Sequence, residues 1–254
     1  MNLRVALVAG GLALISTQSV VAAEITVLTA GAFKQVLLAI VPEYEKQTGN
    51  TVKVENDTVG ALVKRVGGGA AFDVVIVSPA AIGGLAKGGK VVADSRTDLA
   101  KVGVGVVVKE GAPRPDISSV EAFRRALIAA KSVAYIDPAS GGSSGIFVDQ
   151  LLDKLGIGAE VKAKAKLIPG GAVADHIANG EADIGIHQIS EILPVKGVTL
   201  VGPLPTEIQN YTVYAAGISA DSKHVDAAKA LIMLLSGPSG AAIFQSKGME
   251  PTGT

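Results

Sequence analysis

Residues 24–46 read EITVLTAGAFKQVLLAIVPEYEK, and this stretch predicts a strand, a tight loop and an amphipathic helix in direct succession. The first six residues form a run rich in β-branched side chains, and Ala30-Gly31-Ala32 supplies the loop. Thr48-Gly49-Asn50 ends the helix as a C-terminal glycine cap does. Between loop and cap, apolar side chains recur at helical spacing: Phe33, Val36, Leu37, Ile40, Val41 and Tyr44. A strand joined so closely to a helix is the repeating unit of an α/β fold.

The alternation of strand and helix continues to the end of the chain. Residues 72–77 form an apolar run of the kind found in parallel sheets buried on both faces. Two longer apolar strands, at residues 102–108 and 211–218, are placed to cross between two halves of the molecule. We therefore expect an α/β protein of two lobes, with mixed, mostly parallel sheets and two hinge crossings. Lobe 1 is predicted to comprise residues 24–104 and 211–254, and lobe 2 residues 105–210.

The first 23 residues have the form of a removable export signal. A basic start at Arg4 precedes an apolar run over residues 5–15, and Val21-Ala22-Ala23 offers small residues to a signal peptidase. The apolar run is shorter than the ~20 residues that a bilayer-spanning helix needs. We expect cleavage before Glu24, a periplasmic mature chain, and no insertion of that chain into a membrane.

Composition excludes several classes of function. The 254 residues include no cysteine, which rules out disulfides and thiolate metal sites, and the formal net charge of +0 leaves no basic field for a nucleic acid. Aromatic residues make up only 4%, which disfavours carbohydrate binding. No nucleotide-binding glycine motif, G-x-S-x-G elbow or paired-histidine spacing is present. We expect no cofactor and no metal.

Three predicted loops carry small or hydroxylated residues from a strand into a helix: residues 29–32, 57–60 and 137–145. Each would place free backbone N–H groups and the positive end of a helix dipole at the carboxyl edge of a sheet. A single loop of this kind is an ordinary strand–helix connection, but three in register indicate a site for an anion. The expected ligand is therefore a small anion, and a monomer is the expected state.

Several short motifs, in order and spacing, resemble those of periplasmic molybdate-binding proteins. They are residues 27–33 (VLTAGAF), 45–49 (EKQTG), 59–62 (VGAL), 72–75 (FDVV), 137–139 (DPA), 145–147 (GIF) and 182–186 (ADIGI). The resemblance covers nearly the whole mature chain. It implies a type II solute-binding fold, an oxyanion held between two lobes by hydroxyls and amides, and delivery to an ABC permease.

The ligand residues that the resemblance implies are altered in this chain. The first-loop serine of the family falls on Ala32, the second-loop serine falls on Thr58 or Val59, and a tyrosine falls on Gln188. The amides near Ser144 and Val173 carry over. Because buried oxyanion oxygens without partners cost ~1–3 kcal/mol each, an organic polycarboxylate is a better candidate than molybdate. The predicted ligand-binding residues are Gly31, Ala32, Phe33, Lys34, Thr58, Val59, Gly60, Ser140, Ser143, Ser144, Val173, His187 and Gln188.

Two functions remain open at this point. The first is a solute-binding protein of an ABC importer that closes on an anion. The second is an enzyme on the same scaffold, because aconitate isomerase resembles the molybdate-binding family and moves a double bond in a tricarboxylate. A 1,3-proton shift of that kind needs a base and an acid, for which Lys34 and His187 are the candidates. An interaction module is a third and weaker alternative.

Overall fold

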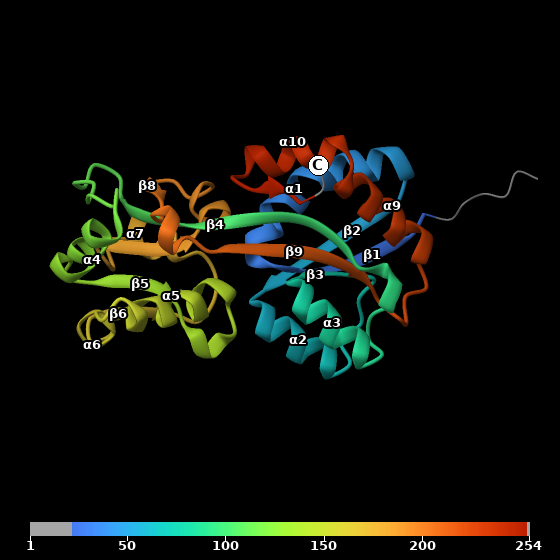
Figure 1. Cartoon of the computed structure of the whole chain (residues 1–254). Coiled ribbons are helices and arrows are strands. Elements are labelled where there is room, and N and C mark those ends of the chain that lie inside the picture. Colours follow the sequence, from blue (N-terminus) through green and yellow to red (C-terminus); the bar gives the residue numbers. More distant parts are fainter. Residues whose placement is uncertain (1–21, 253–254) are drawn as a thin grey trace, which may run out of the picture.

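A computed structural model describes residues 22–252, in which ten strands and ten α-helices alternate along the chain (Figure 1). The predicted export signal at residues 1–23 lies outside the described residues except for its last two. The strands are β1 (Glu24–Ala30), β2 (Thr51–Asp57), β3 (Val74–Val77), β4 (Thr97–Lys109), β5 (Val133–Ile136), β6 (Ala165–Ile168), β7 (Ile184–Gln188), β8 (Val198–Pro203), β9 (Tyr211–Ile218) and β10 (Glu250–Pro251). The helices are α1 (Gly31–Thr48), α2 (Val59–Gly67), α3 (Pro79–Lys87), α4 (Val120–Ala129), α5 (Ser143–Lys154), α6 (Gly158–Lys162), α7 (Val173–Ala178), α8 (Ile189–Ile192), α9 (Val225–Ser236) and α10 (Pro238–Ser246).

The strands follow the order β2-β1-β3-β9-β4-β7-β5-β6, and β8 and β10 also pair with β4. Strand β1 is parallel to β2 and β3, and β5 is parallel to β6 and β7. The strands that join the two halves instead run antiparallel to their neighbours. The predicted mixed α/β fold of two lobes is confirmed, with more antiparallel pairing than expected because both crossing strands oppose the strands beside them.

Strand β4 belongs to both halves of the molecule. Its first part, up to Gly103, pairs with β9, and its second part, from Val104, pairs with β7 and β8. Figure 1 shows β4 and β9 running side by side from one half toward the other. At the changeover the Gln209 amide donates to the Val104 carbonyl and accepts from the Val104 N–H, both at 2.9 Å. The Gln209 side chain therefore fixes the backbone of β4 at the point where it leaves one half for the other.

Each half has two apolar cores, one on each face of its part of the sheet. In the first half, α1, α9 and α10 cover one face and α2 and α3 cover the other (Figure 1). In the second half, one core lies under α4, α5 and α6, and the other under α7 and α8. We propose that the lobe boundaries are those given above, since the cores of residues 25–102 and 214–249 are separate from those of residues 104–204.

Helix α1 shows why the opening stretch sets the fold. Phe33, Val36, Leu37, Ile40 and Tyr44 are buried on one face of α1, as their spacing predicts. The helix ends where Gly49 adopts φ 73° and donates its N–H to the Glu45 carbonyl. At the other end, the preceding Ala30 supplies no side-chain cap. The N-terminal amides of an 18-residue helix are therefore left for another partner.

The short helices α6, α8 and α10 were not anticipated from the sequence. Across residues 22–252, no single helix is long and apolar enough to cross a membrane, although α9 and α10 together satisfy the length and composition criteria with a bend of 60° between them.

Candidate functional site

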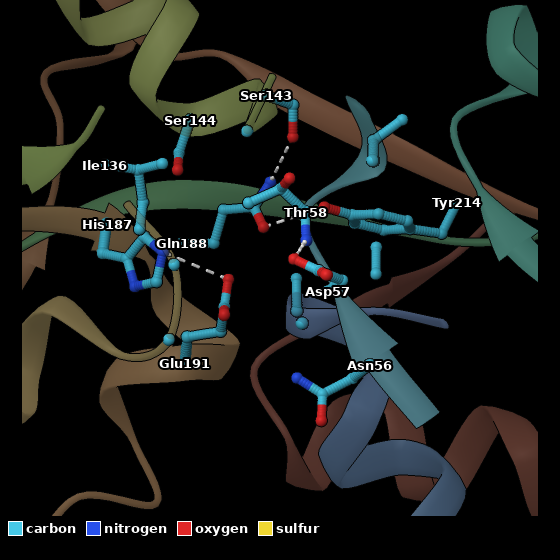
Figure 2. A pocket seen from close by; sticks show the side chains of 17 residues that line it. Asn56, Asp57, Thr58, Ile136, Ser143, Ser144, His187, Gln188, Glu191 and Tyr214 are labelled. Carbon is cyan, nitrogen blue, oxygen red and sulfur yellow. Dashed lines mark hydrogen bonds and ion pairs between the residues drawn. The ribbon is translucent and has the colours of Figure 1, made fainter. Parts of the chain in front are cut away.

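A cavity of about 260 Å³ lies between the two halves, where the strands that feed α1, α2 and α5 come to an end (Figure 2). Both halves contribute to its wall. The lining residues are Ala30, Gly31, Ala32, Asn56, Asp57, Thr58, Val59, Ile136, Gly142, Ser143, Ser144, Gly170, Gly171, His187, Gln188, Glu191 and Tyr214.

The N-termini of three helices lie at this cavity, and each of them follows one of the three predicted loops. Helix α1 begins at Gly31, α2 follows its cap residue Thr58, and α5 begins at Ser143. The first N–H groups of a helix have no partner within it, and the helix dipole adds positive potential at the same end. Ala32, Thr58 and Ser144 thus surround one crevice.

The two halves touch directly at one side of the cavity. The Thr58 hydroxyl donates to the Ser140 carbonyl at 2.6 Å, and the Gly60 N–H donates to the Gly141 carbonyl at 3.1 Å. The backbones approach so closely that a Cβ atom added to Gly60 would lie 2.8 Å from the Gly141 Cα. The structure is therefore that of a closed cleft.

A buried pair of titratable side chains forms part of the wall. The His187 imidazole is 2% exposed, and its Nε2 lies 3.2 Å from Oε2 of Glu191, whose side chain is 16% exposed. Burial raises the pKa of the Glu191 carboxyl to about 8, with an opposing effect from the Lys34 ammonium. Burial lowers the pKa of His187 to about 3. Near neutral pH Glu191 is therefore mostly protonated, His187 is neutral, and the pair carries no net charge.

The same Glu191 carboxyl reaches across to the other half. A Cβ atom added to Gly31 would lie 2.6 Å from Glu191 Oε1, so the carboxyl rests against the first turn of α1. Figure 2 shows His187 and Glu191 side by side at one end of the cavity, joined by their ion-pair contact. Glu191 stands where the two halves meet and next to a helix start that favours a negative charge.

A chain of hydrogen bonds crosses the opposite wall. The Tyr214 hydroxyl donates to Gln188 Oε1 at 2.8 Å, and Gln188 Nε2 donates to the Ser143 hydroxyl oxygen at 3.3 Å. Burial raises the pKa of the Tyr214 hydroxyl, which keeps it protonated. The network therefore fixes the Ser143 side chain at the start of α5.

Most of the predicted site residues line this cavity. They are Gly31, Ala32, Thr58, Val59, Ser143, Ser144, His187 and Gln188. Lys34 lies instead on an adjoining cavity. Four others are not in the lining: Phe33 packs against Tyr214 and Phe244, Val173 is fully buried behind Gly185, and Gly60 and Ser140 make the contact between the halves.

Sequence reasoning missed six lining residues: Asn56, Ile136, Gly170, Gly171, Glu191 and Tyr214. One signal could have found Glu191, because it follows His187 by four residues between the apolar side chains Ile189 and Ile192. Among residues 22–252, no three histidine or carboxylate side chains gather in a metal-ligating cluster.

Two lobes, two crossing strands and a polar cavity walled by helix N-termini define the class of two-lobed solute-binding proteins. Comparison with known proteins agrees. The family model described as "bacterial extracellular solute-binding protein" matches residues 25–250, so the chain belongs to this family.

Three similar proteins refine this picture. An aconitate isomerase from Pseudomonas sp. is 34% identical over 95% of this chain and 94% of its own length. The molybdate-binding protein ModA of Azotobacter vinelandii is 28% identical over 89% of this chain and 90% of its own length. The solved periplasmic molybdate-binding protein of Azotobacter vinelandii superposes with a TM-score of 0.76 at 20% identity, over 89% of this chain and 98% of that one. The predicted resemblance to the molybdate-binding proteins is confirmed.

Proposed function

We propose that this protein binds an organic polycarboxylate in the cavity and catalyses a 1,3-proton shift in it, interconverting trans- and cis-aconitate. The observation that carries the proposal is the buried His187–Glu191 pair in the wall of an anion-binding cavity. A carboxylate whose conjugate acid has a pKa of about 8 is a stronger base than an ordinary glutamate, and a minority of Glu191 is in this deprotonated form at neutral pH. The similarity to an aconitate isomerase supports the same conclusion.

Glu191 replaces Lys34 as the proposed base. In the proposed reaction, the Glu191 carboxylate takes a proton from the substrate methylene carbon, and the C–H electron pair forms the new double bond to the central carbon. The electron pair of the old double bond then takes the proton back at the far carbon, which restores the carboxylate. His187 contacts Glu191 and holds it in place. No oxidant, reductant or further reactant is needed.

The helix starts supply the stabilisation that this step requires. Negative charge spreads onto a conjugated carboxylate as the proton leaves. The amides at the starts of α1 and α5, which have no side-chain cap, can donate to that charge. Such donors are already ordered before the reaction, so no reorganisation is required.

A second candidate function keeps the cavity and omits the reaction. The family membership and the similarity to a molybdate-binding protein favour a solute-binding component that delivers its ligand to an ABC permease. For either function we propose export to the periplasm through the leader at residues 1–23, which the family description supports.

Turnover of trans-aconitate, followed by chromatography, distinguishes the two functions. We expect the wild-type protein to form cis-aconitate and Glu191→Gln to lose about 10²–10⁴-fold in kcat. Glu160→Gln, at an exposed position on α6, is the matched control and should keep full activity. Calorimetric binding without turnover would favour the importer component, and neither binding nor turnover would refute both functions.

A further inference from the structure

A second cavity, of about 700 Å³, adjoins the first. The two share Gly31, Asn56, Gly171 and Glu191 in their walls, so they are compartments of one cleft. We call the smaller one the inner compartment and the larger one the outer compartment. Glu191, the residue proposed to move the proton, stands at the boundary between them.

The outer compartment brings together two lysines from opposite halves. Lys34 lies in the first turn of α1, and Lys196 follows α8. Within residues 22–252, neither ammonium lies within 4.0 Å of a carboxylate oxygen. Asp175 is the opposing charge in the same wall, besides Glu191 itself. The compartment therefore offers two ammonium groups to a substrate carboxylate, and Asp175 and Glu191 are the acidic side chains that face them.

The two compartments differ in the donors they offer. The inner one has backbone amides and hydroxyls together with the Asp57 carboxylate, which accepts from the Thr58 N–H, whereas the outer one adds ammonium groups on flexible side chains. A compact oxyanion fits the fixed donors of the inner compartment alone. A ligand with carboxylates at both ends can use both sets at once.

We infer that the substrate spans both compartments, with one terminal carboxylate held by the inner donors and another held by Lys34 and Lys196. This inference rests on the proposed function and specifies its substrate class as a polycarboxylate with carboxylates on either side of the reacting carbons. The carbons that exchange the proton then lie beside Glu191, between the two anchored ends. The lysines hold the substrate and take no part in the proton transfer.

The test uses Lys34→Met, Lys196→Met and the double variant. Each single change should raise KM for trans-aconitate about fivefold and leave kcat within twofold, because an interaction made equally in the ground and transition states is lost. Binding of propane-1,2,3-tricarboxylate, a saturated analogue that is not turned over, should weaken by the same factor in calorimetry. Lys34→Arg should restore most of the affinity, and Lys223→Met, before α9 and away from both compartments, should change neither value.

The outcomes separate this inference from the proposed function. Unchanged KM and tricarboxylate affinity in the lysine variants of an active protein would refute the outer anchor and leave the isomerase standing. A fall in kcat at constant KM would also refute it, since the lysines would then act through Glu191. If the wild-type protein binds the tricarboxylate without turnover, the calorimetric comparison still decides the outer anchor. A wild-type protein that neither binds nor reacts refutes both proposals.

Discussion

At the scale of single residues, the main feature is a histidine and a glutamate that are in contact and both neutral in the cavity wall. His187 and Glu191 come from the end of β7 and from α8, and only the turn between these elements brings them to 3.2 Å. Their burial shifts both pKa values toward the neutral forms. Because burial disfavours the charged form of Glu191, the free energy of unfolding should depend on pH, and this can be tested without any ligand.

Glu191→Gln should relieve a loss of stability that wild type suffers at high pH. Between about pH 4.5 and 8 the unfolded chain releases the Glu191 proton while the folded protein keeps it. The folded state then binds more protons, so the free energy of unfolding falls as pH rises. Relative to wild type, the variant should gain roughly 2–4 kcal/mol between pH 5 and 8.5 in urea denaturation.

His187 is present in both proteins, so this comparison isolates the contribution of the carboxyl. Glu160→Gln, which removes an exposed carboxyl outside the cavity lining, provides the baseline. A constant offset between wild type and Glu191→Gln across this range would show that the Glu191 pKa is not raised.

Sequence reasoning predicted His187 but not its partner, for a physical reason. A polar side chain at the end of the apolar strand β7 was visible in the sequence, whereas the one-turn helix α8 was not. Without α8 there is no reason for Glu191 to lie beside His187. The prediction that Lys34 binds the ligand stays a prediction, and the structure places this residue on the outer compartment. Lys34 follows buried Phe33 by one helical step of about 100°, which turns its side chain away from the apolar core.

At the scale of elements, the site depends on three strand–helix junctions that were visible in the sequence. Parallel strands place their carboxyl ends at one edge, so loops at residues 29–32, 57–60 and 137–145 could be expected to converge. The contact between two of these loops could not be expected. That contact depends on how far the two halves close on each other, and a local sequence pattern does not predict this distance.

Gly60→Ala should hold the cleft partly open. The new methyl group would meet the backbone of Gly141 and Ser140, which cannot move aside as a flexible side chain would. We expect ligand affinity to fall at least tenfold, with a change in stability below about 1 kcal/mol because alanine favours helix α2. Small-angle scattering with saturating ligand should report a larger radius of gyration than for wild type.

Gly67→Ala is the matched control in the same helix. A Cβ atom at Gly67 meets nothing within 4 Å, so the variant should bind and close like wild type. Wild-type affinity in Gly60→Ala would mean that the contact between the loops is not required for binding.

At the scale of the whole molecule, the ligand is expected to act as a link between two separately packed halves. The cores of the two halves do not merge, and the cleft between them holds amides, hydroxyls and the His187–Glu191 pair. A compound that contacts both walls binds the folded, closed protein and has no comparable site on the unfolded chain. Its binding free energy therefore adds to the stability of the fold.

Propane-1,2,3-tricarboxylate should accordingly raise the melting temperature in a concentration-dependent way. At a hundredfold excess over Kd the added stability is about 2.7 kcal/mol. Differential scanning calorimetry should show one transition that moves upward as the ligand concentration increases. Sodium chloride at equal ionic strength is the control, and an equal shift with that salt would mean that the stabilisation is not due to binding in the cleft.

Strand β4 has a consequence for how the protein can be divided. Residues 97–103 complete one part of the sheet and residues 104–109 complete the other, with the backbone pinned by Gln209 between them. A fragment that ends at Gly103 would contain the first part of β4 without β9, the strand that pairs with it. Amide protons along β4 should thus be among the slowest to exchange with deuterium, and a chain cut within this strand should recover its fold only when both pieces are mixed.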